Sequence, residues 1–231
     1  RLVFRCAVSF RKIPHNGKQK HQYLKVPNLG WVKMTERLRF IGKINGVVIS
    51  QQGDKYFASF SVQATEDEYK RTHPKADTDK GARMAGIDLG IKSALILSDG
   101  IAVENPKPLK KNLRKIKRIS RQLDKRVHAR NKQERLEGKK KSNNYRKLSV
   151  RLSNAQRKVA NIRRDFTQKV TTILTTHYAH IALEDLNVKG MVRNHRLAQS
   201  VSDVAFGELC RQIEYKSMLN GIKVLKADRF Y

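Results

Sequence analysis

The sequence predicts an α/β protein that carries a small all-β part in front of it. Short strand patterns separated by turns occupy the first 80 residues, and a second series of strands begins near Met84. That second series continues as alternating helix and strand patterns, and a long helical stretch at about 105–176 interrupts it. We therefore predict two domains, 1–80 and 81–231, the second an α/β domain with a helical insertion.

The first domain is predicted to be a small barrel or sheet. Its strand patterns form two pairs around Pro-, Gly- or Asp-containing turns, 22–26 with 31–35 and 43–50 with 55–63. In the last of these, Tyr56, Ala58, Phe60 and Val62 alternate with polar residues, which is the period of a half-buried strand. The polar segment 65–82, which contains a Pro, is predicted to be a linker.

The second domain is predicted to start with three antiparallel strands, at 84–89, 93–97 and 101–104. After the helical insertion come a strand at 180–184, a helix through Phe206 and Met218, and a strand at 222–225. We expect Ser200 or Ser202 to cap that helix, and Asn220-Gly221 to close it. A meander followed by helix, strand, helix and strand is the order of an RNase H-like mixed sheet, in which the fourth strand lies beside the first.

The insertion is predicted to be a basic helical hairpin. Apolar residues recur at helical spacing between Leu109 and Val127, and again at spacings of three and four between Tyr145 and Ile173, with a Lys-rich connector at 131–144 between them. Residues 105–169 hold 24 Lys and Arg against 4 Asp and Glu, a net charge of +20. Such concentration favours a nucleic-acid track over a merely solvated face. Representative residues of this track are Arg114, Lys117, Arg118, Arg121, Arg157 and Arg163.

The composition of the whole chain points the same way. It has 50 Lys and Arg against 20 Asp and Glu, a formal net charge of +30. A folded domain with this much positive charge repels itself unless a polyanion neutralises it. Nucleic acid is a commoner polyanionic partner than a membrane surface. No stretch approaches the roughly 20 apolar residues of a membrane-spanning helix, and we find no signal peptide. Cys6 and Cys210 form no metal-binding pair or disulfide framework, so we expect two buried thiols in a reducing, prokaryotic cytoplasm.

Two acidic residues are the candidates for chemistry. Asp88 lies on an apolar strand between two glycines, and Glu184 ends another apolar strand. If these strands are neighbours, the carboxylates converge, and a cation between them would relieve their repulsion. Mg²⁺ (or Mn²⁺) suits oxygen ligands, and two such ions could support phosphodiester cleavage. Alternatively, backbone N–H groups hold Asp88 in a turn and Glu184 is a surface acid. Asp185 should point to the opposite side and cap the following turn.

Several motifs resemble the TnpB (OrfB) family, the accessory transposase of bacterial and archaeal insertion sequences, related to the type V CRISPR effectors. They are Ala-Gly-Ile-Asp-Leu-Gly at 85–90, Ile-Ala-Leu-Glu-Asp-Leu-Asn-Val-Lys-Gly-Met at 181–191, Ala-Asp-Arg-Phe-Tyr at 227–231, and Lys-Val-Pro-Asn-Leu-Gly-Trp-Val-Lys at 25–33. The resemblance implies a wedge-type β-barrel, then a RuvC-type nuclease domain. It also implies a guide RNA and cleavage of matching DNA, with Asp88 and Glu184 as the first two catalytic acids.

The resemblance also sets expectations about the ends of the chain. Both ends fall within patterns, so we expect a truncated protein, without most of the family's helical recognition region. In the family a zinc ribbon and a third catalytic Asp follow the last motif, and the zinc ligands are absent from this sequence. Asp228 could lie near the site but is not that third acid. With two carboxylates alone we expect weak metal binding and little or no cleavage.

Three other functions fit parts of the sequence. The chain could bind nucleic acid with Asp88 and Glu184 idle. It could be a structural RNA-binding protein of the ribosomal type. Gly-Ile-Asp-Leu-Gly also opens the phosphate hairpin of actin-like ATPases and sugar kinases, but the second Asp-x-Gly loop and the adenosine-binding glycines of that class are missing. Trp31 and Tyr145 could stack on bases, although their patterns favour a core role.

Overall fold

A computed structural model describes residues 2–4, 10–13, 21–38, 42–72, 83–128 and 142–227. The chain divides into two compact units, Arg1–Lys75 and Ala76–Tyr231. Each unit has a hydrophobic core of its own.

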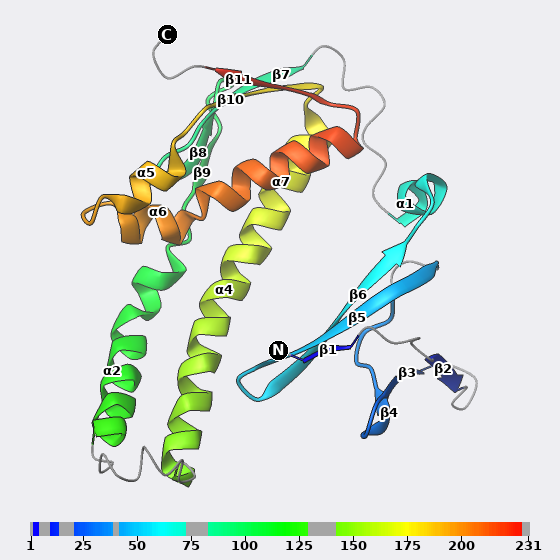
Figure 1. Ribbon diagram of the computed structural model, residues 1–231. Helices are drawn as coiled ribbons and strands as arrows, with labels where there is room; N and C mark the ends of the chain where they lie inside the picture. Colours follow the sequence, from blue (N-terminus) through cyan, green and yellow to red (C-terminus); the bar gives the residue numbers. More distant parts are fainter. Residues whose placement is uncertain are drawn as a thin grey trace. The chain divides into compact units, whose positions relative to one another are not determined.

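In its described residues, the first unit has two antiparallel three-stranded sheets and one helix (Figure 1). One sheet has the order β1-β5-β6 and the other the order β2-β3-β4. The elements are β1 (Leu2–Phe4), β2 (Phe10–Ile13), β3 (His21–Val26), β4 (Gly30–Lys33), β5 (Lys43–Gln52), β6 (Lys55–Gln63) and α1 (Glu66–Thr72). The two hairpins predicted from the turns are thus β3–β4 and β5–β6.

The two sheets of the first unit share one small core. Leu24 and Val26 of β3 and Val47 of β5 are buried, and half-buried Ala58 and Phe60 of β6 pack against them. The predicted alternation in β6 is confirmed for Ala58, Phe60 and Val62, but Tyr56 is exposed because it lies next to the hairpin turn at the end of the strand.

The segment predicted to be a linker contains a helix. The first turn of α1 contains three acidic residues, whose negative charges interact favourably with the positive end of the helix dipole: Glu66, Asp67 and Glu68. The hydroxyl of Thr65 accepts a hydrogen bond from the N–H of Glu68 at 3.4 Å, as in a helix cap. The rest of the predicted linker, 73–82, lies outside the described residues.

The second unit is centred on a five-stranded mixed sheet with the order β11-β10-β7-β8-β9. Its strands are β7 (Met84–Asp88), β8 (Ser93–Leu97), β9 (Ala102–Glu104), β10 (His180–Glu184) and β11 (Lys223–Ala227). The first three form the predicted antiparallel meander. The strand β10 pairs in parallel with β7, so the fourth strand lies beside the first, as its place in the element order predicts.

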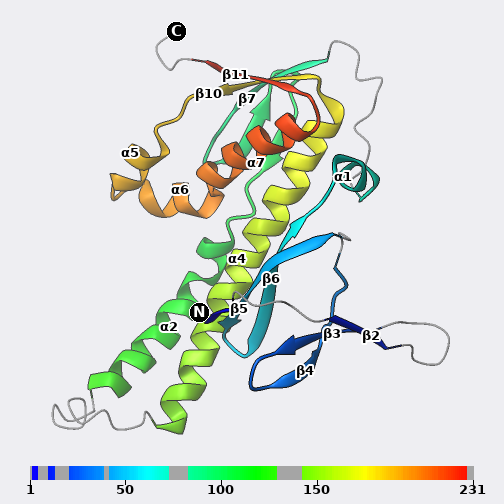
Figure 2. The ribbon, with the colours of Figure 1, turned by 45° about the vertical axis from the view of Figure 1, so that its right-hand side comes forward.

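Two long antiparallel helices, α2 (Pro108–His128) and α4 (Asn143–His177), lie side by side and extend away from the sheet (Figures 1 and 2). Ser142 starts α4 by accepting a hydrogen bond from the N–H of Tyr145 at 3.2 Å. Ile119 of α2 and Ala155 and Val159 of α4 are buried in the seam. The predicted hairpin is therefore confirmed, while its connector at 129–141 lies outside the described residues.

One face of the sheet carries the main core. Ala85 and Ile87 of β7 and Ile181 and Leu183 of β10 are buried against the last turns of α4 and against α6 (Ala198–Val204) and α7 (Phe206–Leu219). Residues that alternate with these, among them Met84, are exposed or half-buried. The helices thus cover one face and leave the other face of β7 and β10 more open.

The single helix predicted through Phe206 is in fact two helices. Ala205 lies between α6 and α7 in the left-handed conformation, with φ of 61°. Neither Ser200 nor Ser202 caps the start, because α6 already begins at Ala198 after Leu197, which makes no side-chain cap. A further short helix, α5 (Val188–Arg193), precedes them. No helix in the described ranges is both long enough and apolar enough to cross a membrane.

Candidate functional site

Asp88 and Glu184 lie at the ends of neighbouring parallel strands. The paired register of β7 and β10 runs from Met84 opposite His180 to Ile87 opposite Leu183. Asp88 and Glu184 are the next residue on each strand and therefore share one position along the sheet. Neighbouring strands lie about 4.8 Å apart, and residues in parallel register share a face. The structure thus brings these two predicted residues together, and their catalytic role stays a prediction.

The surroundings of the two acids are those of an accessible sheet face. Asp88 is exposed and Glu184 is half-buried, and both alternate with the buried residues of their strands. On its other side Asp88 is paired with Ile96 of β8, which is also exposed. Two accessible carboxylates can bind a hydrated cation without the desolvation cost of a buried site.

The turn that follows Asp88 is tight. The N–H of Gly90 donates to the carbonyl of Ala94 at 3.3 Å, and a Cβ at Gly90 would lie 2.8 Å from the carbonyl oxygen of Ser93. Only glycine fits that approach without a shift. On β7 itself, the N–H of Gly86 donates to Oγ of Ser98 at 3.0 Å. These contacts hold the backbone on both sides of Asp88.

The donor types fit a hard divalent cation. Two carboxylates supply oxygen ligands, and Mg²⁺ commonly binds one or two carboxylates together with waters and substrate phosphates. Over the ranges that the structure describes, no group of three or more His, Cys, Asp or Glu is placed to hold a metal. Asp228, which follows β11, lies outside those ranges.

Asp185 belongs to different surroundings. It follows the last residue of β10 and is exposed. The predicted cap of the following turn is made by another residue. Oδ1 of Asn187 accepts from the N–H of Gly190 at 2.9 Å and starts α5, whereas Asp185 is joined to β11 through its backbone N–H.

Four of the predicted nucleic-acid residues lie on one face of α2. Arg114, Lys117, Arg118 and Arg121 are spaced by three and four residues, and all four line one shallow hollow of about 400 Å³. Lys125 continues this row by one helical turn. A row of cations along one helix face matches the repeating charge of a phosphate backbone.

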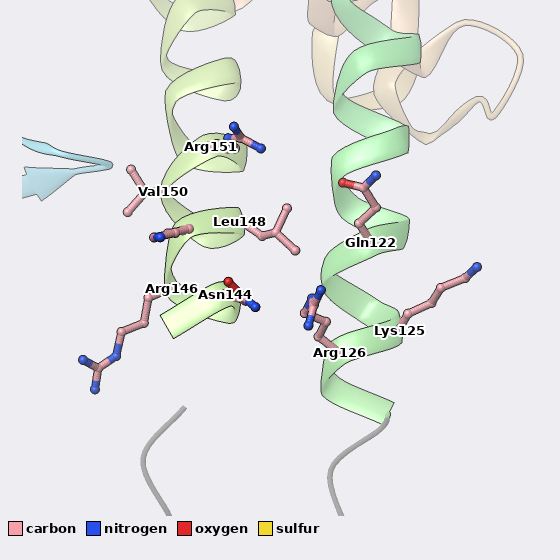
Figure 3. Close-up of a pocket in the computed structure, with 9 residues that line it drawn as sticks. Gln122, Lys125, Arg126, Asn144, Arg146, Leu148, Val150 and Arg151 are labelled. Carbon is pink, nitrogen blue, oxygen red and sulfur yellow. The ribbon is translucent and has the colours of Figure 1, made fainter. Parts of the chain in front are cut away.

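A larger hollow of about 860 Å³ lies between the ends of the two hairpin helices (Figure 3). In Figure 3, Leu148 points from α4 toward α2, whereas Arg146 and Lys125 point away from the gap between the helices. Sequence reasoning did not single out the basic residues here, which are Lys125, Arg126, Arg146, Lys147 and Arg151. No sequence signal separates them from the other basic residues of the hairpin, because their shared hollow is lined from both helices.

The two predicted residues of α4 differ from those of α2. Arg157 is half-buried. Arg163 forms an ion pair with Asp203 of α6, with 3.1 Å between Nη2 and Oδ1, and its side chain is 25% exposed. Their contact with nucleic acid stays a prediction.

Other candidates of the sequence are placed as follows. Trp31 lies on the surface of β4 and is 44% exposed, so the expectation of a core role is wrong for it. It is opposite Lys25 on β3, on the face away from buried Leu24 and Val26. Tyr145 is half-buried in α4. Cys210 is half-buried against the main core, where burial raises the pKa of its thiol, and Cys6 lies outside the described residues.

Fold and site together define an α/β protein with a mixed five-stranded sheet and two acids at the ends of neighbouring strands. A basic helical hairpin is inserted in the chain between β9 and β10. Residues 59–195 match the model of the OrfB_IS605 family, described as probable transposases. The chain belongs to this family. The match covers most of the sheet, both hairpin helices and both acids.

Curated relatives carry related names. A protein of Escherichia coli, InsQ, provisionally named an RNA-guided DNA endonuclease, is 30% identical over 228 residues, which cover 92% of this chain and 52% of that protein. A Streptomyces pristinaespiralis protein with the same provisional name is 28% identical over 146 residues, 63% of this chain and 33% of its own length. The chain thus spans about half, or less, of the length of these relatives.

Proposed function

We propose that this chain contributes two parts of a transposon-encoded, RNA-guided DNA endonuclease. The second unit is the RNase H-like, RuvC-type nuclease, and the first unit is the wedge. The observation that carries the proposal is the parallel register of β7 and β10, which gives Asp88 and Glu184 the same position on one sheet face. The strand order β11-β10-β7-β8-β9 supports the RNase H-like assignment, and the paired antiparallel sheets of the first unit are compatible with a wedge.

The proposed chemistry is hydrolysis of a DNA phosphodiester. Asp88 and Glu184 would hold Mg²⁺ or Mn²⁺, and bound ions of this kind activate water and stabilise the leaving oxygen. The role of the chain's own residues is placement. The hydrogen bonds of Gly86 and Gly90 fix the backbone around Asp88, and the ladder between Leu183 and Ile87 fixes that around Glu184. With two acidic ligands we expect weak metal affinity and little or no cleavage.

The proposed role of the basic hairpin is to bind the backbones of guide RNA and target DNA. Support comes from the row of Arg114, Lys117, Arg118 and Arg121 along one hollow of α2. Cations on a helix face neutralise phosphates without reading the base sequence. In this proposal sequence selection comes from base pairing with the guide.

Metal titration tests the proposal most directly. We expect calorimetry with Mn²⁺ to show binding that Asp88→Asn and Glu184→Gln each abolish. Asp185→Asn is the matched control, because it removes the same charge from the exposed residue that follows β10. Unchanged heats in Asp88→Asn would rule out the proposed site. Cleavage of DNA matched to a bound guide, measured with Mg²⁺ and lost in Asp88→Asn, would extend the test to the reaction.

A second candidate is a nucleic-acid binder whose acids are idle. It is favoured by the lack of a cluster of three metal-binding side chains within the described ranges. This candidate predicts that an RNA–DNA heteroduplex binds equally well with and without Mg²⁺. It also predicts the same Mn²⁺ titration for wild type and for Asp88→Asn.

A further inference from the structure

The carboxylate of Asp203 in α6 joins three elements that are far apart in the sequence. Its side chain is 4% exposed. Oδ1 accepts from the N–H of Leu109 at 2.8 Å, and Oδ2 accepts from the N–H of Lys110 at 3.0 Å, so both oxygens bind the start of α2. Nε and Nη2 of Arg163 in α4 donate to Oδ1 at 3.3 and 3.1 Å.

These contacts give α2 a cap that its own sequence does not provide. The first turn of α2 contains no acidic residue, and the residue before it, Lys107, has a positive φ of 46°. The first N–H groups of a helix need acceptors, and a negative charge there is favourable. Since Asp203 supplies both from another helix, the start of α2 is attached to α6 through these hydrogen bonds.

The second hairpin helix has an independent attachment. The last turns of α4 contribute Val170 and Leu174 to the main core, so this end of α4 is packed on the sheet by its own apolar residues. α2 extends away from the sheet beside α4 (Figures 1 and 2). The contacts of Asp203 therefore set where α2 begins, and with it the place of the row that contains Arg118 and Arg121.

The same junction touches the loop that follows Asp88. Asn105 is buried just before α2, and its Nδ2 donates to the carbonyl of Ile91 at 3.0 Å. Its Oδ1 accepts from the N–H of Lys107 at 3.0 Å. The segment 105–110 is thus bound to the Asp88 loop on one side and to Asp203 on the other.

We infer that Asp203 is a positioning residue, which fixes the basic face of α2 relative to the ends of β7 and β10 that carry Asp88 and Glu184. This inference rests on the proposed function, because a fixed hairpin matters when nucleic acid on it must reach the two acids. Asp203 contacts Leu109, Lys110 and Arg163, and it acts on the two acids and on the row of α2 through these contacts.

The direction in which Asp203→Asn changes nucleic-acid affinity distinguishes a positioning role from a simple effect of charge. Asp203→Asn makes the chain more positive, so electrostatics alone predicts equal or tighter binding of nucleic acid. Loss of the α2 position predicts weaker binding, by about threefold or more, because phosphate contacts are no longer held in register. Asp165→Asn is the matched control, since Asp165 is 63% exposed on the hairpin helix α4 and pairs with Lys169 in an i,i+4 bridge.

The geometry is measured in the same variants. Spin labels at exposed Gln122 of α2 and Lys223 of β11, with Cys6 and Cys210 replaced by Ala, report the distance between hairpin and sheet. We expect Asp203→Asn to broaden this distance distribution. We also expect it to speed amide exchange at Leu109 and Lys110 by about ten- to a hundredfold. Asp165→Asn should leave both readouts at the wild-type values.

If Asp203→Asn does not fold, Arg163→Met tests the same contact, with Arg164→Met as its control for lost charge. The broader distance distribution is then expected in Arg163→Met alone. An unchanged distribution and unchanged exchange would overturn the inference, and so would a broader distribution with affinity equal to that of Asp165→Asn. Failure of the wild type to bind an RNA–DNA heteroduplex would instead overturn the proposed function.

Discussion

Buried polar side chains, rather than apolar ones alone, join α4 to α7. Thr167, Thr171 and Thr175 recur every four residues on α4 and are buried. The hydroxyl oxygen of Thr171 lies 2.7 Å from the carbonyl oxygen of Thr167 and 3.1 Å from Oε1 of Gln212. It also accepts from Nζ of Lys216 at 2.7 Å. Such a network fixes one register of two packed helices, because any slip leaves buried polar groups unpaired.

Thr171→Val should destabilise the protein by about 1–3 kcal/mol, because it removes one partner from Oε1 of Gln212 and one from Nζ of Lys216 while the shape is kept. Thr176→Val is the matched control. The hydroxyl of Thr176 donates to the carbonyl of Thr172 within the same helix, so we expect a change within about 0.5 kcal/mol. Urea unfolding followed by circular dichroism measures both. Equal losses in the two variants would show that the network adds nothing across the helices.

Glu208 gives this region a dependence on pH. Hydrogen bonds from Arg211 lower the pKa of its carboxyl from 4.5 to about 2, despite the opposing effect of burial, and Gln212 adds a further bond. A depressed pKa in the folded state means that the stabilisation is complete above about pH 4.5 and is lost as the pH falls toward 2. Because the side chain is 42% exposed, solvent screening limits the effect to about 1 kcal/mol or less.

We therefore expect wild type to be more stable than Glu208→Gln at pH 7, and the difference to vanish as the pH approaches 2. Thermal unfolding at a series of pH values measures it. In an Arg211→Gln background the difference at pH 7 should shrink, since the main cause of the shift is gone. A difference that stays constant over the whole pH range would contradict the assignment.

At the scale of elements, the break between α6 and α7 turns the chain back toward the sheet. Ala205 has φ of 61°, a conformation that costs a residue with a Cβ about 1 kcal/mol relative to glycine. Its N–H still bonds the carbonyl of Val201, and its carbonyl accepts from Glu208 and Leu209, so one residue ends one helix and begins the next.

Ala205→Gly should raise the stability by up to about 1 kcal/mol, because the released strain exceeds the added freedom of the unfolded chain. The same substitution at Ala160, exposed in the middle of α4, should lower the stability by about 1 kcal/mol. Opposite signs of the two changes in denaturant unfolding are the expected result. A loss of stability in both variants would mean that Ala205 bears no strain.

The spacing of apolar residues was enough to predict the elements that bury one side. The hairpin α2–α4, the meander and the place of β10 beside β7 all follow from repeating apolar positions and from the order of elements. The break at Ala205 has no such signal, since alanine favours a continuous helix. The cap of α2 was equally hidden, because Asp203 follows the amide it binds by 94 residues.

The candidate site shows the same limit. Asp88 and Glu184 stand out as acids on apolar strands, and pairing of those strands was enough to place them together. The basic residues at the far end of the hairpin, such as Arg126 and Arg151, were not separable from other solvated charges, because their shared hollow depends on how the two helices pack.

At the scale of the whole molecule, charge is distributed unevenly. Residues 105–169 carry a net charge of +20 out of the +30 of the chain. The hairpin therefore concentrates positive potential on an element that extends from the sheet (Figure 2), while the sheet edge holds the two acids. A polyanion is drawn to the hairpin first, and Coulomb steering of this kind weakens as salt is added.

Affinity for duplex DNA should therefore fall steeply with salt, and the slope should report contacts on α2. The double variant Arg118→Gln/Arg121→Gln removes two charges from the row on one hollow. Each phosphate contact contributes about 0.9 to the slope of log affinity against log salt, so the slope should fall by roughly 1.8. Arg193→Gln/Arg196→Gln is the control, because it removes the same charge from exposed positions of the second unit outside the hairpin. Fluorescence anisotropy over a range of salt concentrations measures both slopes. If the two variants lower the slope equally, the protein binds through its net charge and the row on α2 is no specific track.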